Sequence, residues 1–426
     1  MEKLELDKKH FFIIALVLIL IFFVNLFLYY QNFKELKSSK YYQTTLKVIS
    51  QYPKRTKKGK EYQILRLKMK NGICFFGLAW QKNMPNLQNK FIKCKISTKK
   101  LTFYRYLKGG FLPIYHIGIL PDENNNIKKK IQYFISSQHK NKITKELFAA
   151  LFFAKKIDKD IRKQVSLLGI SHLVAISGFH LGVLSFLIFL ILTPVYKIFQ
   201  DKFFPYRSRM LDLMILSLAL LFLYLYFLNF IPSLLRAYVM MVVGYFFYIR
   251  YINIFSFQTI LLTVLILLAF FPELIFNIAF WFSISGVFYI FLFLHYYQYL
   301  KSWQIFIMIN FWVYLLMQPI VHFVFPVFAL SQLLSPFLSM LFTVFYPLEL
   351  ILHLLKIGDI LDTPILMLLE FKAHIINLRT PFWFLSVYIV TSLLSIYKKI
   401  FLYLLFMQAT IFFIVLLFLF YSNTFG

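Results

Sequence analysis

The stretch "SHLVAISGFHLGVLSF" (Ser171–Phe186) lies inside a long apolar run, yet it carries two histidines, three serines and two glycines. Polar side chains at membrane depth normally face the interior of a helix bundle or a water-filled cavity. The stretch therefore predicts a membrane helix with one polar side. It also raises the question of what that side contacts.

A helical wheel over residues 169–182 separates two stripes. Gly178 and Gly182 lie on a small-residue stripe of the G-x-x-x-G type, which lets helix backbones approach closely. The other stripe, with His172, Ser177 and His180, is then predicted to line a wet path. The alternative remains open that both histidines are hydrogen-bonded structural residues between helices.

The composition excludes a soluble globular protein. The 426 residues are 60% hydrophobic and 20% aromatic, and the mean hydropathy is +0.71. We predict an α-helical polytopic membrane protein with about nine to eleven membrane helices. The first run, 11–30, is long enough to span a bilayer and is followed by no small-residue cleavage site, so we expect a retained helix.

The positive charge is concentrated in one region. The net charge is +29, and 31 of the 46 Lys and Arg residues lie between residues 32 and 165. Lys3, Lys8 and Lys9 place the N-terminal tail in the cytoplasm by the positive-inside rule, and a long domain can be exported regardless of its charge. We therefore expect a basic domain in the periplasm of a multi-pass protein of the bacterial inner (plasma) membrane. The alternative is that the many lysines reflect a Lys-rich proteome and have no functional meaning.

We expect four regions along the chain. Residues 1–30 form a cytoplasmic tail and the first membrane helix, and residues 31–112 form the exported basic domain. Residues 113–165 form an amphipathic helical segment at the membrane interface. Residues 166–426 form a polytopic helical channel domain.

The basic domain has the pattern of β-strands. Leu65, Leu67 and Met69 alternate with cationic residues before the hairpin signal Asn71-Gly72. This pattern predicts a small all-β, OB-like barrel. Such barrels bind single-stranded nucleic acid through cations and aromatic stacking, which contributes ~1–3 kcal/mol per base. A solvated strand face is the alternative. The candidate DNA-binding residues are Lys54, Arg55, Lys57, Lys58, Lys60, Arg66, Lys68, Lys93, Lys95, Tyr52 and Tyr62.

Cys74 and Cys94, the only two cysteines, both lie in this domain. They are candidates for a disulfide in an oxidising periplasm, although free thiols are equally compatible with the sequence. Two cysteines without nearby histidines do not make a zinc site. The sequence contains neither a P-loop nor an H-E-x-x-H motif, so we expect no metal, no cofactor and no enzymatic activity.

Further polar residues interrupt the later apolar runs. Arg236 lies one turn inside a helix that starts at Pro232, where a cation costs ~2.5–3.5 kcal/mol on insertion scales. It needs a partner or an anionic passenger, unless it snorkels to the interface. We predict channel-lining roles for His172, Ser177, His180, Arg236, Trp281 and Ser283, and helix-packing roles for Gly178, Gly182 and Gly286.

Four segments resemble the ComEC family of competence proteins, which are inner-membrane channels for DNA uptake. "ISHLVAISGFHLGVL", within Glu146–Leu184, is similar to the family's H-L-L-A-I-S-G-L-H core. "PSLLRAYVMMVVGYFF" (Pro232–Phe247) and "FFPELIFNIAFWFSISGVFYIF" (Phe270–Phe291) resemble two further family segments. "FALSQLLSPFLSM" follows as a Pro/Ser-rich stretch.

The resemblance implies a channel that moves single-stranded DNA into the cytoplasm during natural transformation. It also implies a periplasmic DNA-receptor protein and a cytoplasmic helicase or translocase as partners. Since we expect this chain to be a form without the family's C-terminal metallo-β-lactamase-like domain, a separate nuclease is a further expected partner. Trp281 stands where the family has an amide, and Phe271-Pro272 replaces its D-P. A small-solute or lipid transporter and an intramembrane hydrolase built on Ser177 and His180 are the alternatives.

Overall fold

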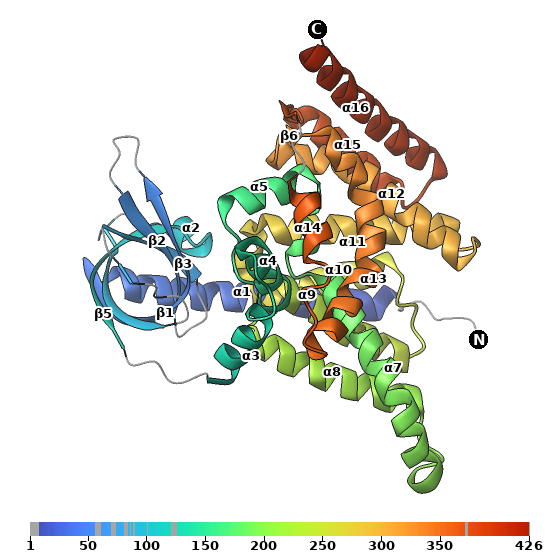
Figure 1. Cartoon of the computed structure of the whole chain (residues 1–426), viewed down its shortest axis with the longest axis horizontal. Coiled ribbons are helices and arrows are strands. Elements are labelled where there is room, and N and C mark those ends of the chain that lie inside the picture. The colour runs from blue at the N-terminus through green and yellow to red at the C-terminus, as the bar shows by residue number, and fades with distance from the viewer. Residues whose placement is uncertain are drawn as a thin grey trace. The chain divides into compact units, whose positions relative to one another are not determined.

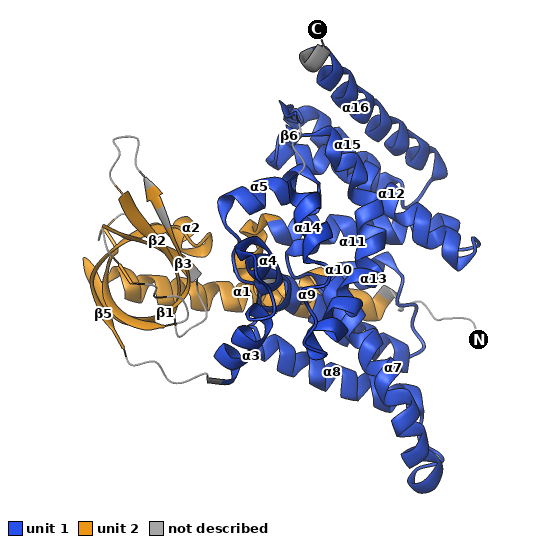
Figure 2. Cartoon of the chain, in the orientation of Figure 1, with its two compact units in different colours: residues 1–6, 127–263, 279–426 blue, residues 7–126, 264–278 orange. Residues whose placement is uncertain are grey.

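A computed structural model describes residues 8–55, 61–69, 74–80, 84–85, 87, 90–99, 101–120, 126–370 and 374–425. The chain divides into two compact units (Figures 1 and 2). Unit 2 contains residues 7–126 and 264–278, and the remaining helices belong to unit 1. The basic domain of the sequence thus lies in a unit of its own, together with the first helix.

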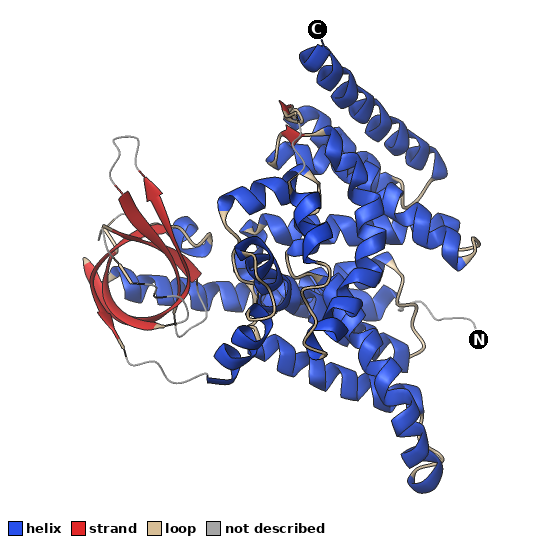
Figure 3. Ribbon diagram, in the orientation of Figure 1, coloured by secondary structure: helices blue, strands red, loops and turns tan. Residues whose placement is uncertain are grey.

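Five strands of unit 2 form a closed barrel in the order β1-β2-β3-β5-β4 (Figure 3). β3 and β5 pair in parallel and the other neighbours are antiparallel. This closed five-stranded architecture confirms the predicted OB-like barrel. The strands are β1 (Tyr41–Arg55), β2 (Glu61–Lys68), β3 (Cys74–Ala79), β4 (Phe91–Ser97) and β5 (Phe111–Ile119), with helix α2 (Phe103–Leu107) between the last two.

The alternation seen in the sequence produces the core of the barrel. Leu65 and Leu67 of β2 are fully buried, and Ile92, Cys94 and Ile96 of β4 point inward between exposed neighbours. β5 continues to Ile119, so the expected domain boundary at residue 112 is too early. The sequence missed this strand end because β5 lacks a strict alternation of apolar and polar residues.

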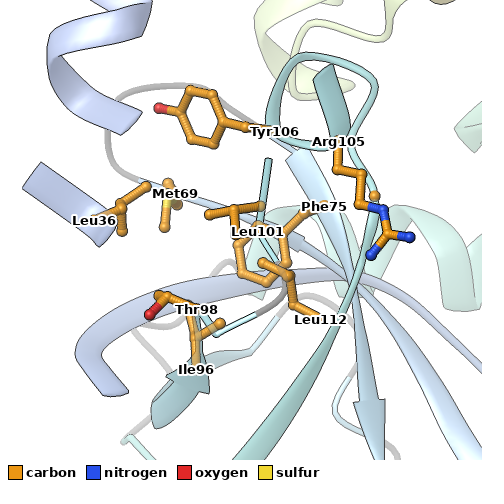
Figure 4. Close-up of a pocket in the computed structure, with 10 residues that line it drawn as sticks. Leu36, Met69, Phe75, Ile96, Thr98, Leu101, Arg105, Tyr106 and Leu112 are labelled. Carbon is orange, nitrogen blue, oxygen red and sulfur yellow. The ribbon is translucent and has the colours of Figure 1, made fainter. Parts of the chain in front are cut away.

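The C-terminal end of α1 (Lys8–Lys37) closes one end of the barrel. Phe33 and Leu36 belong to the barrel core, and the Phe33 ring lies 5.8 Å from that of Tyr106 on α2. Figure 4 shows Leu36 beside the small apolar cavity at this end. The first helix is therefore also a structural part of the exported domain that we predicted.

Two hydrogen bonds within unit 2 fix α1 beside residues 264–278. The Asn25 amide donates to the carbonyl of Ala269 at 2.7 Å, and the Tyr29 hydroxyl donates to the Glu273 carboxylate at 2.8 Å. Asn25, the half-buried polar interruption in the first apolar run, thus has a hydrogen-bond partner for its amide.

Unit 1 is helical. Among the described residues of the whole chain, seven helices are long and apolar enough to cross a membrane, and three shorter apolar helices accompany them. The membrane-type helices from Gly178 onward, of which α10 continues from unit 1 into unit 2, are α7 (Gly178–Phe203), α8 (Arg209–Phe227), α9 (Pro232–Ile249), α10 (Phe257–Phe270), α11 (Ile278–Tyr297), α12 (Ser302–Val324), α13 (Ser335–Leu354), α15 (Phe382–Leu394) and α16 (Lys399–Phe425).

Short elements connect these helices. They include two 3-10 turns and a two-stranded ribbon that pairs residues 327–328 with 376–377. The connecting elements are α3 (Asn126–Ser136), α4 (Lys142–Phe153), α5 (Lys159–Leu167), α6 (Ser171–Val174), η1 (Pro272–Phe276), η2 (Leu330–Leu334), α14 (Asp362–Leu369), β6 (Val327–Phe328) and β7 (Ile376–Asn377).

Helix α4, within the expected interfacial segment 113–165, contributes to a core of unit 1. Phe148 and Leu151 of α4 are buried in a core cluster with Phe342 and Tyr346 of α13. α4 therefore packs within unit 1, and the interfacial position of the segment stays a prediction. Half of the ten lysines in this segment lie on α3 and α5, where the helices do carry one apolar face.

Candidate functional site

The polar stretch Ser171–Phe186 is not one continuous helix. α6 ends at Val174, residues 175–177 are non-helical, and α7 begins at Gly178. The helical wheel over residues 169–182 was therefore wrong, because it assumed an unbroken helix. An interrupted helix leaves main-chain groups without intrahelical partners, and at membrane depth these must find partners in protein or water.

Side chains from the Pro/Ser-rich segment satisfy the carbonyls in front of the break. Gly169 has a left-handed backbone (φ 70°), and a Cβ there would lie 3.0 Å from the Cβ of Ser335, so the close approach requires glycine. The hydroxyl of Ser335 donates to Gly169 O at 3.0 Å, Ser331 to Leu167 O at 2.6 Å, and the Gln332 amide to Ser166 O at 3.3 Å.

The start of α9 binds the break from another direction. The Ser233 hydroxyl donates to the carbonyl of Ile176 at 2.7 Å. One turn later a Cβ on Gly178 would meet the Cβ of Ala237 at 3.1 Å. Pro232 at the first position of α9 fits the helix start, because its missing N–H needs no partner there.

Arg236 connects α9 to the start of α11. Its side chain is 8% exposed, its guanidinium donates to the carbonyl of Ala279 at 2.6 Å, and it lies 5.7 Å from the centre of the Phe280 ring. The alternative of a snorkelling arginine is therefore wrong, because the charge is held inside unit 1. The four segments that resemble the ComEC family thus meet at one place, which we call the helix-break junction.

His180 supports the junction from the interior. It is fully buried, and its ring stands edge-on to Tyr346 at 4.6 Å. Its Nδ1 accepts from the main-chain N–H of Ser177 at 3.2 Å, with the Ser177 hydroxyl also at 3.2 Å. Because the N–H occupies the single lone pair of Nδ1, this arrangement caps α7 and gives no support to a serine–histidine hydrolase.

The structure separates the predicted channel-lining residues into two groups. His172, Trp281 and Ser283 have exposed side chains, and His172 Nε2 lies 3.3 Å from the Ser339 hydroxyl of α13. Ser177 is half-buried. His180 and Arg236 are buried between helices, so in this conformation they do not face an open path, which corrects their predicted role.

The predicted packing glycines divide in the same way. Gly178 packs closely against α9, whereas a Cβ added at Gly182 or Gly286 would meet nothing within 4 Å. The packing roles of Gly182 and Gly286 are therefore wrong. The G-x-x-x-G pattern failed because the helix begins at its first glycine and only that glycine faces a neighbouring backbone.

On the barrel, the predicted cations gather on the outer surface of adjoining strands. Lys93 and Lys95 of β4 are exposed, and their β1 partners in the register are Thr45 and Gln43. Lys68 of β2 is opposite Lys47 of β1. Since Lys47 is half-buried, burial lowers the pKa of its ammonium group, and the neighbouring Lys68 charge lowers it further.

Aromatic rings that were not predicted as DNA-binding residues lie among these cations. The Lys47 ammonium is 5.7 Å from the centre of the Phe91 ring, and the exposed rings of Tyr41 and Tyr115 contact each other at 6.2 Å. We call these groups the cationic wall. The sequence signal that could have identified these rings is a hydrophobic residue at an outward-facing position of a predicted strand. The cationic wall comprises Tyr41, Lys47, Lys68, Phe91, Lys93, Lys95 and Tyr115.

A second group lies where β1, β2 and β3 adjoin. Tyr62 of β2 pairs with the exposed Lys54 of β1, and its ring lies 5.1 Å from that of Trp80, which is also exposed. Tyr52 of β1 and Arg66 of β2 are half-buried. The side chain of Arg55 and all of Lys57, Lys58 and Lys60 lie outside the described residues.

The candidate disulfide is not formed at Cys94. This thiol is free and buried in the barrel, and burial raises its pKa to about 12. β3, which carries Cys74, and β4 are both neighbours of β5 and do not pair with each other. The side chain of Cys74 lies outside the described residues. Within the described residues no group of His, Cys, Asp and Glu could hold a metal ion.

Fold and site define a multi-pass membrane protein whose interrupted helices meet at a polar junction and which carries a cationic OB-like barrel. A family model described as Competence protein matches residues 151–422. The chain therefore belongs to the competence protein family, which confirms the resemblance to ComEC, and the family implicates it in DNA uptake for competence. The comparisons with curated proteins and with solved structures gave no match.

Proposed function

We propose that this protein is the inner-membrane channel that moves single-stranded DNA into the cytoplasm during natural transformation. The observation that carries the proposal is the cationic wall, where Lys47, Lys93 and Lys95 lie among exposed aromatic rings on a closed barrel. Cations attract phosphates and rings stack on bases whatever the sequence, which suits a carrier of any DNA.

The helix-break junction supports the second half of the proposal. Non-helical backbone at membrane depth is tolerated where it is buried in protein or lines a water-filled cavity. We assign the strand's path to the exposed polar side, with His172, Ser177, Trp281 and Ser283 along it. Arg236 and His180 then act as supports that hold α9, α11 and α13 around this path, instead of contacting DNA.

The proposed orientation places the barrel in the periplasm, since the positive-inside rule puts the N-terminal tail in the cytoplasm. A periplasmic receptor would deliver the DNA, a separate nuclease would supply the single strand, and a cytoplasmic helicase or translocase would pull it. No observation favours a small-solute or lipid transporter over this assignment.

The test is binding of a labelled oligonucleotide by the full chain in nanodiscs, titrated across salt concentrations. We expect affinity for single strands to fall with salt, with a log–log slope of about −0.7 per phosphate neutralised. K93Q and K95Q should each flatten the slope by about 0.7. K197Q and K202Q, which change exposed lysines of α7, are the matched controls. Binding without salt dependence, or equal loss in the controls, contradicts the proposal.

A further inference from the structure

Two histidines from distant parts of the sequence face each other inside unit 1. His139 lies between α3 and α4, and His353 lies near the end of α13. Both are buried, and their Nε2 atoms are 2.9 Å apart. The Phe148 ring stacks on His139 with a centroid distance of 4.4 Å, which helps to exclude water from the pair.

The outer nitrogen of each ring has its own partner. His139 Nδ1 lies 2.8 Å from a carboxylate oxygen of Asp362, and His353 Nδ1 lies 2.7 Å from the carbonyl of Glu349. A carbonyl and a carboxylate accept, so each Nδ1 must carry a proton and donate it. A neutral imidazole has a single proton, and both Nε2 atoms would then present lone pairs to each other.

Counting protons resolves this conflict. The chain from Asp362 to the Glu349 carbonyl has three hydrogen bonds and needs three protons, while two neutral rings supply two. One additional proton between the Nε2 atoms completes the chain. A second additional proton would place two N–H groups against each other at 2.9 Å, which the geometry excludes.

A metal ion fits this geometry less well than a proton. Two imidazole nitrogens bound tetrahedrally to zinc at ~2.0–2.1 Å lie about 3.4 Å apart, beyond the observed separation. A stable zinc site also needs further ligands, and the residues that the structure describes contain no His, Cys, Asp and Glu group suited to a metal.

We propose that His139 and His353 bind one shared proton, and that this proton fastens the α3–α4 connection to α13 and α14. Neighbouring hydrogen bonds identify the segments that this proton would hold together. The Thr144 hydroxyl of α4 donates to the second carboxylate oxygen of Asp362 at 3.0 Å. The Gln138 amide donates to the carbonyl of His353 at 3.0 Å and accepts from the N–H of Gly358 at 3.0 Å.

The surroundings of His139 act on its affinity for a proton in opposite directions, and their net effect lowers its pKa. Burial lowers the pKa of His139, whereas Asp362 and Glu349 act in the opposite direction. A Glu349 carboxylate oxygen lies 3.2 Å from His353 Nδ1, so a carboxylate flanks each ring. These two carboxylates and His353 are the titratable groups that act on His139.

The proton count determines how the contact between the two rings depends on pH. We call the state with the rings in contact closed and the state with this contact broken open. Solvent-exposed imidazole side chains ordinarily have a pKa near 6.5, so an open state with two solvated rings binds two additional protons at low pH and none at high pH. The closed state binds one. Closing is therefore most favourable near pH 6.5, and its equilibrium constant falls about 3-fold one pH unit away and about 25-fold two units away, on either side.

The experiment is hydrogen exchange of residues 138–148 in the full chain in nanodiscs, followed by mass spectrometry from pH 5 to 8.5 and corrected for the intrinsic rates. We expect protection to peak near pH 6.5 and to fall by about 25-fold at pH 8.5. H139Q and H353Q should remove the peak, and H295Q, a change of an exposed histidine on α11, should keep it.

Three results would overturn the proposal. They are a flat or monotonic profile in the unsubstituted protein, a peak that persists in both variants, and protection that a chelator removes and zinc restores. The profile of the unsubstituted protein decides the question alone if either variant fails to fold. This inference does not depend on DNA transport.

Discussion

The hydroxyl of Ser335 donates to the main-chain carbonyl of Gly169 at 3.0 Å, although 166 residues separate the two in the chain. The bond joins the first turn of α13 to the loop after α5, where a left-handed glycine ends the helix. The carbonyls that a helix end leaves without intrahelical partners cost free energy when they are buried, unless donors such as this hydroxyl reach them. The helix-break junction is therefore a built feature of the fold and not a local irregularity.

Ser335→Ala should destabilise the protein by about 1–3 kcal/mol, because the Gly169 carbonyl would lose its donor in a desolvated place. Thermal unfolding of the purified chain in detergent measures the change. Ser386→Ala removes a comparable hydroxyl that bonds within exposed α15 and should leave the midpoint nearly unchanged. Equal midpoints for the two variants would show that the junction does not need this bond.

Gly178→Leu and Gly182→Leu should differ sharply. A side chain at position 178 meets Ala237 of α9, whereas the space beside Gly182 is open. Overpacking costs about 1–3 kcal/mol, so we expect lower stability for the first variant alone. Comparable thermal midpoints in a side-by-side melt would refute the close contact between α7 and α9.

Arg236→Ala removes a buried charged donor and should cost about 1.5–3 kcal/mol. Arg250→Ala, at the exposed end of the same helix, should change stability by less than about 0.5 kcal/mol. The informative comparison is stability against DNA uptake in cells. Loss of uptake at unchanged stability would mean that Arg236 contacts the passenger, contrary to the supporting role assigned here.

Cys94 should behave as an inert thiol. Its pKa is raised to about 12 by burial, so the reactive thiolate stays scarce between pH 7 and 9. In a Cys74→Ser background, maleimide labelling of the folded chain should remain slow throughout this range and become fast in denaturant. Rapid labelling that climbs with pH in the folded protein would place the thiol at the surface.

The sequence predicted the barrel well because strand alternation is a local property. Leu65, Leu67, Ile92 and Ile96 all point inward as expected. The aromatic residues of the cationic wall were missed because register between strands decides which rings adjoin which lysines, and register is not local. Phe91 beside Lys47 is an example.

The sequence could locate the helix-break junction, but it could not predict the contacts within it. The four family segments marked the right places, yet the helical wheel placed His180 on an open face because it could not see the break at residues 175–177. The pair His139 and His353 was out of reach entirely. The two residues are 214 positions apart, and no spacing rule connects them.

The most direct test of the account is uptake of labelled DNA by a strain that lacks this protein, with the periplasm and the cytoplasm scored separately. The account predicts that DNA still enters the periplasm while none reaches the cytoplasm, and that the unsubstituted protein restores delivery. Normal arrival of DNA in the cytoplasm without the protein would contradict it.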